Sequence, residues 1–242
     1  MARTFLSVVG RTVIFFALCL VLFPAAAEAD RDTEDKQLYW AEQSAYDHNP
    51  DLESSALLTA SGRARRDGDT LYLTPSEATE YILTDSSDDD CEKQITNCET
   101  YRLAAYLPTR HAFLVIVGYY EGRSWALVDD RTGEVTDLPG VPHFSPDDQR
   151  LFVSDMSLSD GGRNIAIWRR DGRTWAVEWS RDPVAGATSG DGYFCGFVSW
   201  KGDRIDLKFW REWNDDRKPV NPWSAVVTKD GAGWRLRTTR PK

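Results

Sequence analysis

Short apolar segments that alternate with polar positions recur along this chain, and turn-forming residues separate them. The arrangement occurs three times, over residues 104–138, 141–179 and 195–238, and a weaker fourth copy covers residues 56–86. Short strands repeated at a period near 40 residues are typical of the blades of a β-propeller. The pattern therefore predicts a repeat protein built from strands.

Period-two alternation indicates the individual strands, as in Ile205 to Phe209, where every second residue is apolar. Phe113 to Val117 is apolar on both faces and should form a buried inner strand. Asp171-Gly172 predicts a hairpin turn, because such turns need a positive φ. Helical periodicity is nearly absent. We therefore predict an all-β fold, a small β-propeller-like array of four to five blades, with an incomplete ring as the alternative.

Residues 143–148 (HFSPDD), followed by a basic residue and an apolar strand, resemble the PD40-type, WD40-like blade of TolB-like periplasmic β-propellers. The family pattern is typically F-S-P-D-G, and this chain departs from it at Asp148, where the family usually has glycine. The first copy keeps a proline at Pro108, and the third copy lacks this turn. The resemblance implies a propeller-like fold and a scaffold or binding role more often than catalysis. It transfers no catalytic residue.

The N-terminus has the features of a secretory signal peptide over residues 1–29. Arg3 and Arg11 give a positive start, Thr12 to Phe23 is apolar, and Ala27 to Ala29 (AEA) suits cleavage before Asp30. An uncleaved anchor is the alternative, but the apolar run is shorter than the ~20 residues that a spanning helix needs. We expect a periplasmic or secreted protein without stable membrane insertion after cleavage.

The mature chain divides into a polar segment, residues 30–56, and a repeat domain, residues 57–242. The length suits one domain with a full core. A short helix could form over Glu34 to Tyr46, but its apolar residues are sparse, so we expect a tether that packs only partly. If the blades form only an arc, residues 30–56 or another subunit should cover the end strands.

The chain is acidic, with a formal charge of −9. The signal segment carries two arginines and one glutamate, so its removal changes this charge to −10. Such a charge repels nucleic acid and anionic membranes. We therefore expect a protein or carbohydrate partner and no nucleic acid.

Three cysteines remain after cleavage of the signal segment, and export favours a disulfide. Cys91 and Cys98 lie in one polar loop and are the natural pair, which would contribute roughly 2–3 kcal/mol in the chain-entropy model. Cys195 lies among aromatic residues and is expected to be a buried free thiol. A metal site formed by all three is the alternative, but their spacing matches no zinc pattern.

Candidate catalytic chemistry is sparse. The sequence has no G-x-S-x-G motif and only three histidines, His48, His111 and His143. The last two lie in corresponding regions of adjacent copies, so a metal pair with an aspartate is one hypothesis, and turn or surface histidines are the simpler interpretation. Carboxylates are too numerous to identify a hydrolase pair.

The acidic run could bind calcium, although it lacks the spacing of an EF-hand, and a solvated loop is the better interpretation. Its carboxylates are Asp85, Asp88, Asp89 and Asp90. We expect no cofactor.

The loop between the second and third strands of each copy is where the copies differ most. Loops on a rigid scaffold commonly carry binding, and Trp and Arg are favoured at interfaces. We predict a recognition surface formed by Tyr119, Tyr120, Trp210, Arg211, Trp213 and Arg217. The alternative is that these aromatic residues fold into the core. The predicted function is non-enzymatic binding of a protein or carbohydrate, and the alternatives are an exported hydrolase with acidic catalytic residues and a structural adaptor.

Overall fold

The computed structural model describes eight stretches of the chain: residues 30–44, 50–93, 98–120, 122–154, 165–181, 194–215, 218–231 and 233–239. The predicted signal segment, residues 1–29, lies outside them. Strands dominate the described residues, which confirms the all-β class. Among these residues, no helix is both long and apolar enough to span a membrane.

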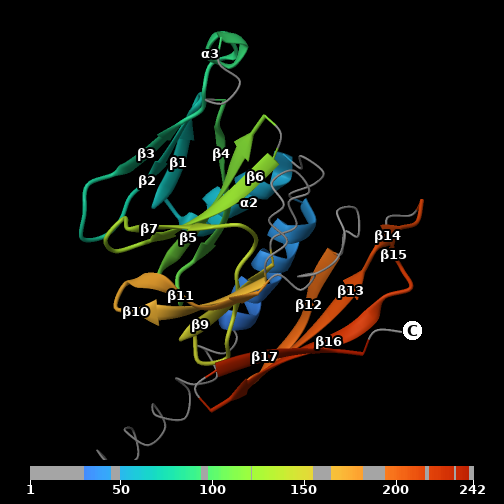
Figure 1. Cartoon of the computed structure of the whole chain (residues 1–242). Helices are drawn as coiled ribbons and strands as arrows, with labels where there is room; N and C mark the ends of the chain where they lie inside the picture. The colour runs from blue at the N-terminus through green and yellow to red at the C-terminus, as the bar shows by residue number, and fades with distance from the viewer. Residues whose placement is uncertain are drawn as a thin grey trace, which may run out of the picture.

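Four antiparallel sheets follow one another along the chain (Figure 1). The first sheet contains β1 (Ala64–Asp67), β2 (Thr70–Leu73) and β3 (Tyr81–Thr84). The second contains β4 (Thr100–Leu107), β5 (Ala112–Tyr119), β6 (Gly122–Asp129) and β7 (Val135–Leu138). The third contains β8 (His143–Phe144), β9 (Arg150–Ser154), β10 (Ile165–Asp171) and β11 (Thr174–Arg181). The fourth contains β12 (Phe194–Lys201), β13 (Arg204–Trp210), β16 (Trp223–Asp230) and β17 (Gly233–Thr238).

Each sheet corresponds to one copy of the repeat, with the weak copy forming the three-stranded first sheet. The predicted turn at Gly172 has a φ of 64°, so it adopts the left-handed conformation that the hairpin requires. A small hairpin, β14 (Glu212–Trp213) and β15 (Pro219–Val220), is inserted between β13 and β16. The third copy is therefore longer because of this hairpin.

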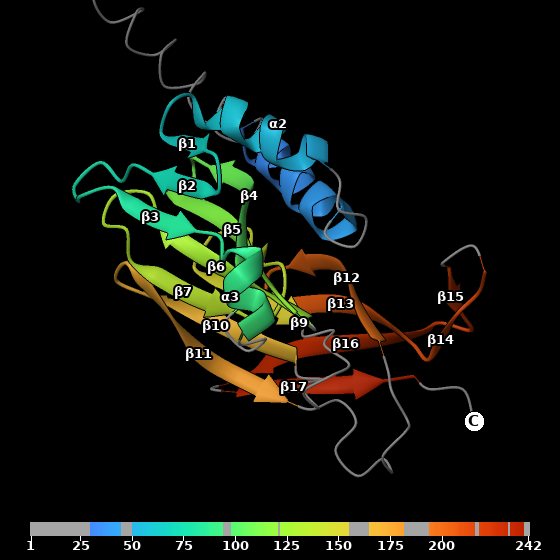
Figure 2. The same ribbon diagram turned by 90° about the horizontal axis from the view of Figure 1, so that it is seen from above.

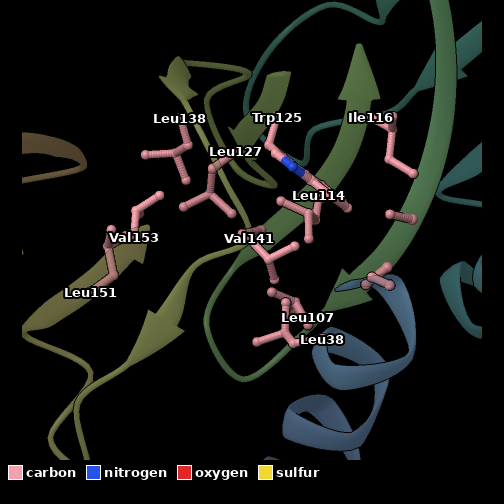
Figure 3. Close-up of a cluster of buried hydrophobic side chains, with 14 of the residues drawn as sticks. Leu38, Leu107, Leu114, Ile116, Trp125, Leu127, Leu138, Val141, Leu151 and Val153 are labelled. Carbon is pink, nitrogen blue, oxygen red and sulfur yellow. The ribbon is translucent and has the colours of Figure 1, made fainter. Parts of the chain in front are cut away.

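The sheets pack face to face in chain order. Along β5, Phe113, Val115 and Val117 contact the first sheet's core cluster, and Leu114 and Ile116 contact the cluster shared with the third sheet. Figure 3 shows the cluster between the second and third sheets. The predicted burial of Phe113 to Val117 on both faces is confirmed. A third cluster joins the third and fourth sheets.

The four sheets form an open succession in the described part of the chain. None of its three core clusters contains residues of both the first and the fourth sheet. Two helices, residues 30–44 and α2 (Pro50–Ala60), lie side by side along the sheets instead (Figures 1 and 2). Gln37 Nε2 donates a hydrogen bond to Thr59 Oγ1 between them at 3.3 Å.

Residues 30–44, called the N-terminal helix below, do not form the partly packed tether that we expected. Leu38 and Ala41 are buried in the cluster between the second and third sheets. The remaining buried positions of this helix are Glu34 and Ser44, so its inner face is half polar. A search for apolar periodicity therefore underestimates it.

Side chains occupy the free edge of β4. Glu53 of α2 accepts a hydrogen bond from Leu103 N at 3.0 Å, and Asp85 accepts one from Tyr101 N at 2.6 Å. Arg66 donates to Tyr101 O. An unpaired edge would offer these groups to another strand, so the three side chains protect the second sheet against edge-to-edge pairing.

The acidic run after the first sheet forms a short helix, α3 (Asp88–Lys93), at the top of Figure 1. Ser87 Oγ accepts a hydrogen bond from Asp90 N at 3.1 Å and donates one to Asp90 Oδ2 at 2.6 Å. This is a capping arrangement with an aspartate in the third position. The predicted disulfide between Cys91 and Cys98 is present, with the Cα atoms 4.7 Å apart, and such a bond fits an oxidising compartment.

Candidate functional site

The end of the fourth sheet carries a group of aromatic rings on its outer face, the face turned away from the third sheet. Phe194 of β12 pairs across the strands with Trp210 of β13, and their ring centroids are 5.9 Å apart. Trp213 of β14 meets Trp210 edge-on at 4.9 Å and Phe194 at 5.5 Å. We call these three residues the aromatic platform. Trp210 is 5% exposed and Trp213 is 43% exposed, so Trp213 presents the platform to solvent.

The hairpin that bears Trp213 is held by its own hydrogen bonds. Asn214 N donates to Lys218 O at 3.0 Å, and Lys218 N donates to Asn214 Oδ1 at 2.7 Å. In Figure 1 the hairpin projects at the right-hand edge of the molecule. Arg211 is exposed beside it, and Arg217, the remaining predicted residue, lies outside the described residues. Trp213 is therefore displayed from a structured loop.

Trp210 lies directly over Gly196 on the neighbouring strand. A Cβ atom at Gly196 would sit 3.0 Å from Cζ3 and 3.1 Å from Cη2 of Trp210, which is closer than a normal contact. The absence of a side chain at Gly196 thus gives the indole its place. Sequence analysis missed this role because the strand register that brings Gly196 under Trp210 cannot be read from one strand.

Replacing Gly196 with valine should push Trp210 away from the sheet and lower the free energy of unfolding by about 1–3 kcal/mol. Chemical denaturation followed by tryptophan fluorescence measures both the stability and the environment of the ring. Ser224→Val, on the same exposed face, is the matched control and should change stability by less than about 0.5 kcal/mol. Equal effects of the two substitutions would contradict this account of Gly196.

Tyr119 and Tyr120 lie elsewhere, at the turn between β5 and β6 of the second sheet. They are 44% and 65% exposed, and Tyr119 Oη lies 2.9 Å from Ser124 Oγ. Figure 1 shows the second sheet well separated from the β14–β15 hairpin. The five predicted residues that the structure describes therefore do not form one continuous surface, because the two loops that carry them belong to the second and fourth sheets, which are not adjacent in the succession of sheets.

The tryptophans that follow turns at matched positions of the copies divide into two groups, although this matching predicts all four as core residues. Trp125 and Trp234 are buried. Trp175 and Trp179 are only partly buried and pack against the edges of two core clusters. Both belong to β11, an end strand of the third sheet, where no strand of the described residues pairs with its other side.

His111 lies in the turn between β4 and β5, with its Nδ1 3.3 Å from Asp130 Oδ1. Asp130 is 1% exposed and accepts hydrogen bonds from Tyr106 Oη at 2.9 Å and Arg63 Nη1 at 3.0 Å. Burial and the contact with Asp130 raise the pKa of Tyr106. Because Arg63 immediately precedes β1, this group ties the first sheet to the second.

His143 is in a different environment, at the junction of the N-terminal helix with the third and fourth sheets, where its side chain is 12% exposed. Its ring stacks on Phe197 at 4.1 Å, and its Nε2 lies 3.8 Å from Glu42 Oε1 without a hydrogen bond to any residue that the structure describes. Burial lowers the pKa of His143 to about 3 and raises that of Glu42. His111 and His143 therefore have separate partners, and the third histidine, His48, lies outside the described residues.

Cys195 of β12 is a buried free thiol, as predicted. Burial raises its pKa, and the charge of Glu42 raises it further. A thiol that keeps its proton is a poor nucleophile and a poor metal ligand. Across the described ranges, no group of three or more His, Cys, Asp or Glu side chains is placed to hold a metal ion.

The acidic run considered for calcium has other partners. Asp85 binds Arg66 and the backbone of Tyr101, and Asp90 binds Ser87. Asp88 and Asp89 are exposed in the first turn of α3. Two of the four carboxylates thus serve local structure.

An ion-pair network fixes the N-terminal helix to the turn regions of the second and third sheets. Arg110 is 4% exposed and contacts Glu34 at 3.2 Å, Asp35 at 2.7 Å and Asp148 at 3.1 Å. Asp148 also pairs with Arg31 at 2.7 Å. Asp148 has a φ of 52°, which explains why glycine is usual at this position of the repeat pattern. Here aspartate takes the strained position, and its carboxylate anchors the helix.

Comparisons with known proteins add no family to this picture. No protein-family model matches the sequence, and no curated protein shows significant similarity to it. The aromatic platform is therefore interpreted from its own geometry.

Proposed function

We propose that this protein is a non-enzymatic binding protein that recognises a protein or carbohydrate through the aromatic platform. The observation that carries the proposal is the exposure of Trp213, a residue that is 43% exposed while its ring contacts those of Trp210 and Phe194. Large aromatic side chains dominate binding energies and are usually covered in a monomer. Exposed and fixed, Trp213 suits recognition.

The neighbouring rings support this function through entropy. A side chain that is already immobilised loses little conformational freedom when a ligand covers it. Trp210 lies over Gly196, and Trp213 meets Trp210 at an interplanar angle of 81°. The platform is thus arranged before the ligand arrives.

The scaffold in this proposal is a propeller-like arc of four blades. Its support is the match between the repeat copies and the sheets, together with the face-to-face packing of successive sheets. The two helices cover strand β4 on the side where a closed propeller would have its central channel. The proposed location is the periplasm or the extracellular space, which the disulfide and the signal-like N-terminus support.

Replacing Trp213 with alanine should weaken partner binding by about 30-fold or more while the protein stays folded. Binding is measured on a panel of immobilised polysaccharides and by pull-down from periplasmic extract, with partners identified by mass spectrometry. Tyr120→Ala, an exposed aromatic residue on the second sheet, is the matched control and should bind normally. The proposal fails if the tyrosine variant loses the same partners, or if Trp213→Ala keeps them all.

A further inference from the structure

The outer face of the fourth sheet is basic, although the chain as a whole is acidic. Residues on this face alternate along each strand, and the cross-strand pairing places them in rows. Its charged side chains are five cations and two anions: Lys201, Arg204, Lys208, Arg235, Arg237, Asp206 and Asp230. The chain contains 29 Lys and Arg against 38 Asp and Glu, so this face reverses the general balance.

Much of this positive charge is not neutralised. Arg204 pairs with Asp206 at 2.6 Å, and Arg235 pairs with Asp230 at 3.2 Å. Lys208 and Arg237 are exposed and have no hydrogen bond or ion pair within the described part of the fourth sheet and its neighbours. The charge of Lys201 acts on the Asp206 carboxylate, whose pKa is lowered first by its bond to Arg204. Three cations therefore remain in excess.

The aromatic platform forms one end of the same face. Trp210 and Phe194 make the first row, Lys208 lies in the next, Arg237 in the third and Arg204 in the fourth. At the spacing of a strand, the face extends roughly 20 Å from Trp210 to Arg204. An indole that a sugar ring can stack on is thus continuous with a row of cations.

We propose that the outer face of the fourth sheet binds an anionic polysaccharide, a chain of carboxylated or sulfated sugars. This inference rests on the proposed binding function of the aromatic platform and names its ligand class. Sugar rings stack on Trp213, and the acidic groups further along the chain contact Lys208, Arg237 and Lys201. Charge complementarity supports it, because an anionic ligand replaces the counter-ions of these exposed cations.

A linear polyanion fits this surface better than a broad acidic partner. Trp213 contacts the rings of Phe194 and Trp210 and is 43% exposed, so more than half of its surface is already covered and cannot insert into a membrane. A narrow chain can follow the basic face and stay away from the acidic remainder of the protein, including α3 at the opposite end (Figure 1). A membrane or an acidic protein domain would also face that negative charge, which acts over about 8 Å at physiological salt.

The test measures binding of the purified mature protein to polygalacturonate and to dextran sulfate, with neutral dextran as reference. We expect salt-sensitive binding to at least one polyanion and none to dextran. The double variant Lys208→Glu/Arg237→Glu should bind at least about tenfold more weakly. The matched control, Arg169→Glu/Arg181→Glu, makes the same charge change at exposed positions on the third sheet and should bind within twofold of the unmodified protein.

The carboxylated and sulfated polymers distinguish the two sources of negative charge. Equal binding to polyglutamate or to vesicles of phosphatidylcholine with phosphatidylglycerol would overturn the assignment to a polysaccharide. So would equal losses in the two double variants, or binding to neither polyanion. If Trp213→Ala abolishes binding to another partner while the charge reversals do not, this inference fails and the proposed function stands. If only the charge reversals matter, the platform is not the binding site and the proposed function fails.

Discussion

Replacing Arg110 with alanine is expected to lower the free energy of unfolding by about 3–5 kcal/mol, the range for removing one partner of a buried ion pair. The guanidinium is enclosed by Glu34, Asp35 and Asp148 and lies 4.5 Å over the ring of Phe144. Without it, the almost fully buried Glu34 would have no ion-pair partner among the described residues, and Asp148 would keep the partly exposed Arg31 as its cationic partner. The N-terminal helix should then detach more readily than the sheets.

The environment of Glu34 shows why the loss of Arg110 would be unfavourable. Burial already raises its pKa, although Thr109 donates two hydrogen bonds to it and Arg110 supplies a positive charge. Urea denaturation gives the stability change, and hydrogen exchange over residues 30–44 reports the detachment of the helix. Arg173→Ala, which breaks an exposed pair with Glu77, is the control and should lower the stability far less than Arg110→Ala does, because water screens an exposed ion pair. Similar losses in both variants would refute the anchoring role of Arg110.

The sheets could be predicted from the sequence because the apolar and polar residues of a strand alternate within the strand itself. Ile205 to Phe209 alternates, Gly172 marks its turn, and both features are local. The N-terminal helix is indicated only weakly, as a possible short helix over Glu34 to Tyr46, and α2 is not indicated by the sequence pattern. The buried face of the N-terminal helix contains Glu34, which is tolerated inside only because Arg110, 76 residues away, binds it. Only the folded chain brings the two together.

The candidate site was predicted in part for the same reason. Exposed aromatic residues in the longest loop pointed to Trp213, and the structure places it in solvent. Phe194 and Gly196 position the tryptophan rings only through the register between β12 and β13. That register cannot be predicted from the sequence of either strand alone. The repeat pattern groups Tyr119 and Tyr120 with the tryptophans, because their loops occupy equivalent positions in the copies. Equivalent positions predict that loops emerge on the same side of the repeat array, but they do not predict the distance between the loops.

The basic outer face of the fourth sheet shows a further limit of composition. A formal charge of −9 correctly describes the whole chain and conceals a region of opposite sign. That region becomes visible only when alternate residues of β13 and β17 are placed on one face by their pairing through β16. Net charge therefore describes only the average of the surface, and the charge of a binding face can differ from that average.

Replacing His143 with phenylalanine should make the protein less sensitive to acid. The folded protein holds this imidazole with a pKa of about 3, lowered from 6.5 by burial. The unfolded chain takes up the proton near pH 6.5 and the folded chain does not until about pH 3. Between these values the unfolded state binds more protons, so His143 costs about 1.4 kcal/mol of stability for each pH unit below 6.5.

The neighbours of His143 set the design of this experiment. The pKa of Glu42, which lies 3.8 Å away, is raised, so its protonation favours the folded state as the pH falls and offsets part of the loss. The Cys195 thiol, with its raised pKa, stays neutral throughout the range. Urea denaturation between pH 7 and pH 4.5 avoids most of the titration of the exposed carboxylates. Glu42 is present in both proteins, so the difference between their slopes reports mainly on the histidine. Phenylalanine keeps an aromatic ring against Phe197, where the rings stack at 9°.

The experiment compares the slope of the free energy of unfolding against pH in the unmodified protein and in the His143→Phe variant. His143→Phe should flatten that slope by up to about 1.4 kcal/mol per pH unit, because its side chain takes up no proton in the unfolded state. His111→Asn is the control, since asparagine tolerates the positive φ of 56° at that turn and His143 remains in place. It should retain the acid sensitivity of the unmodified protein. An unchanged slope in His143→Phe would mean that the buried imidazole is protonated in the folded state, with Glu42 carrying the compensating charge.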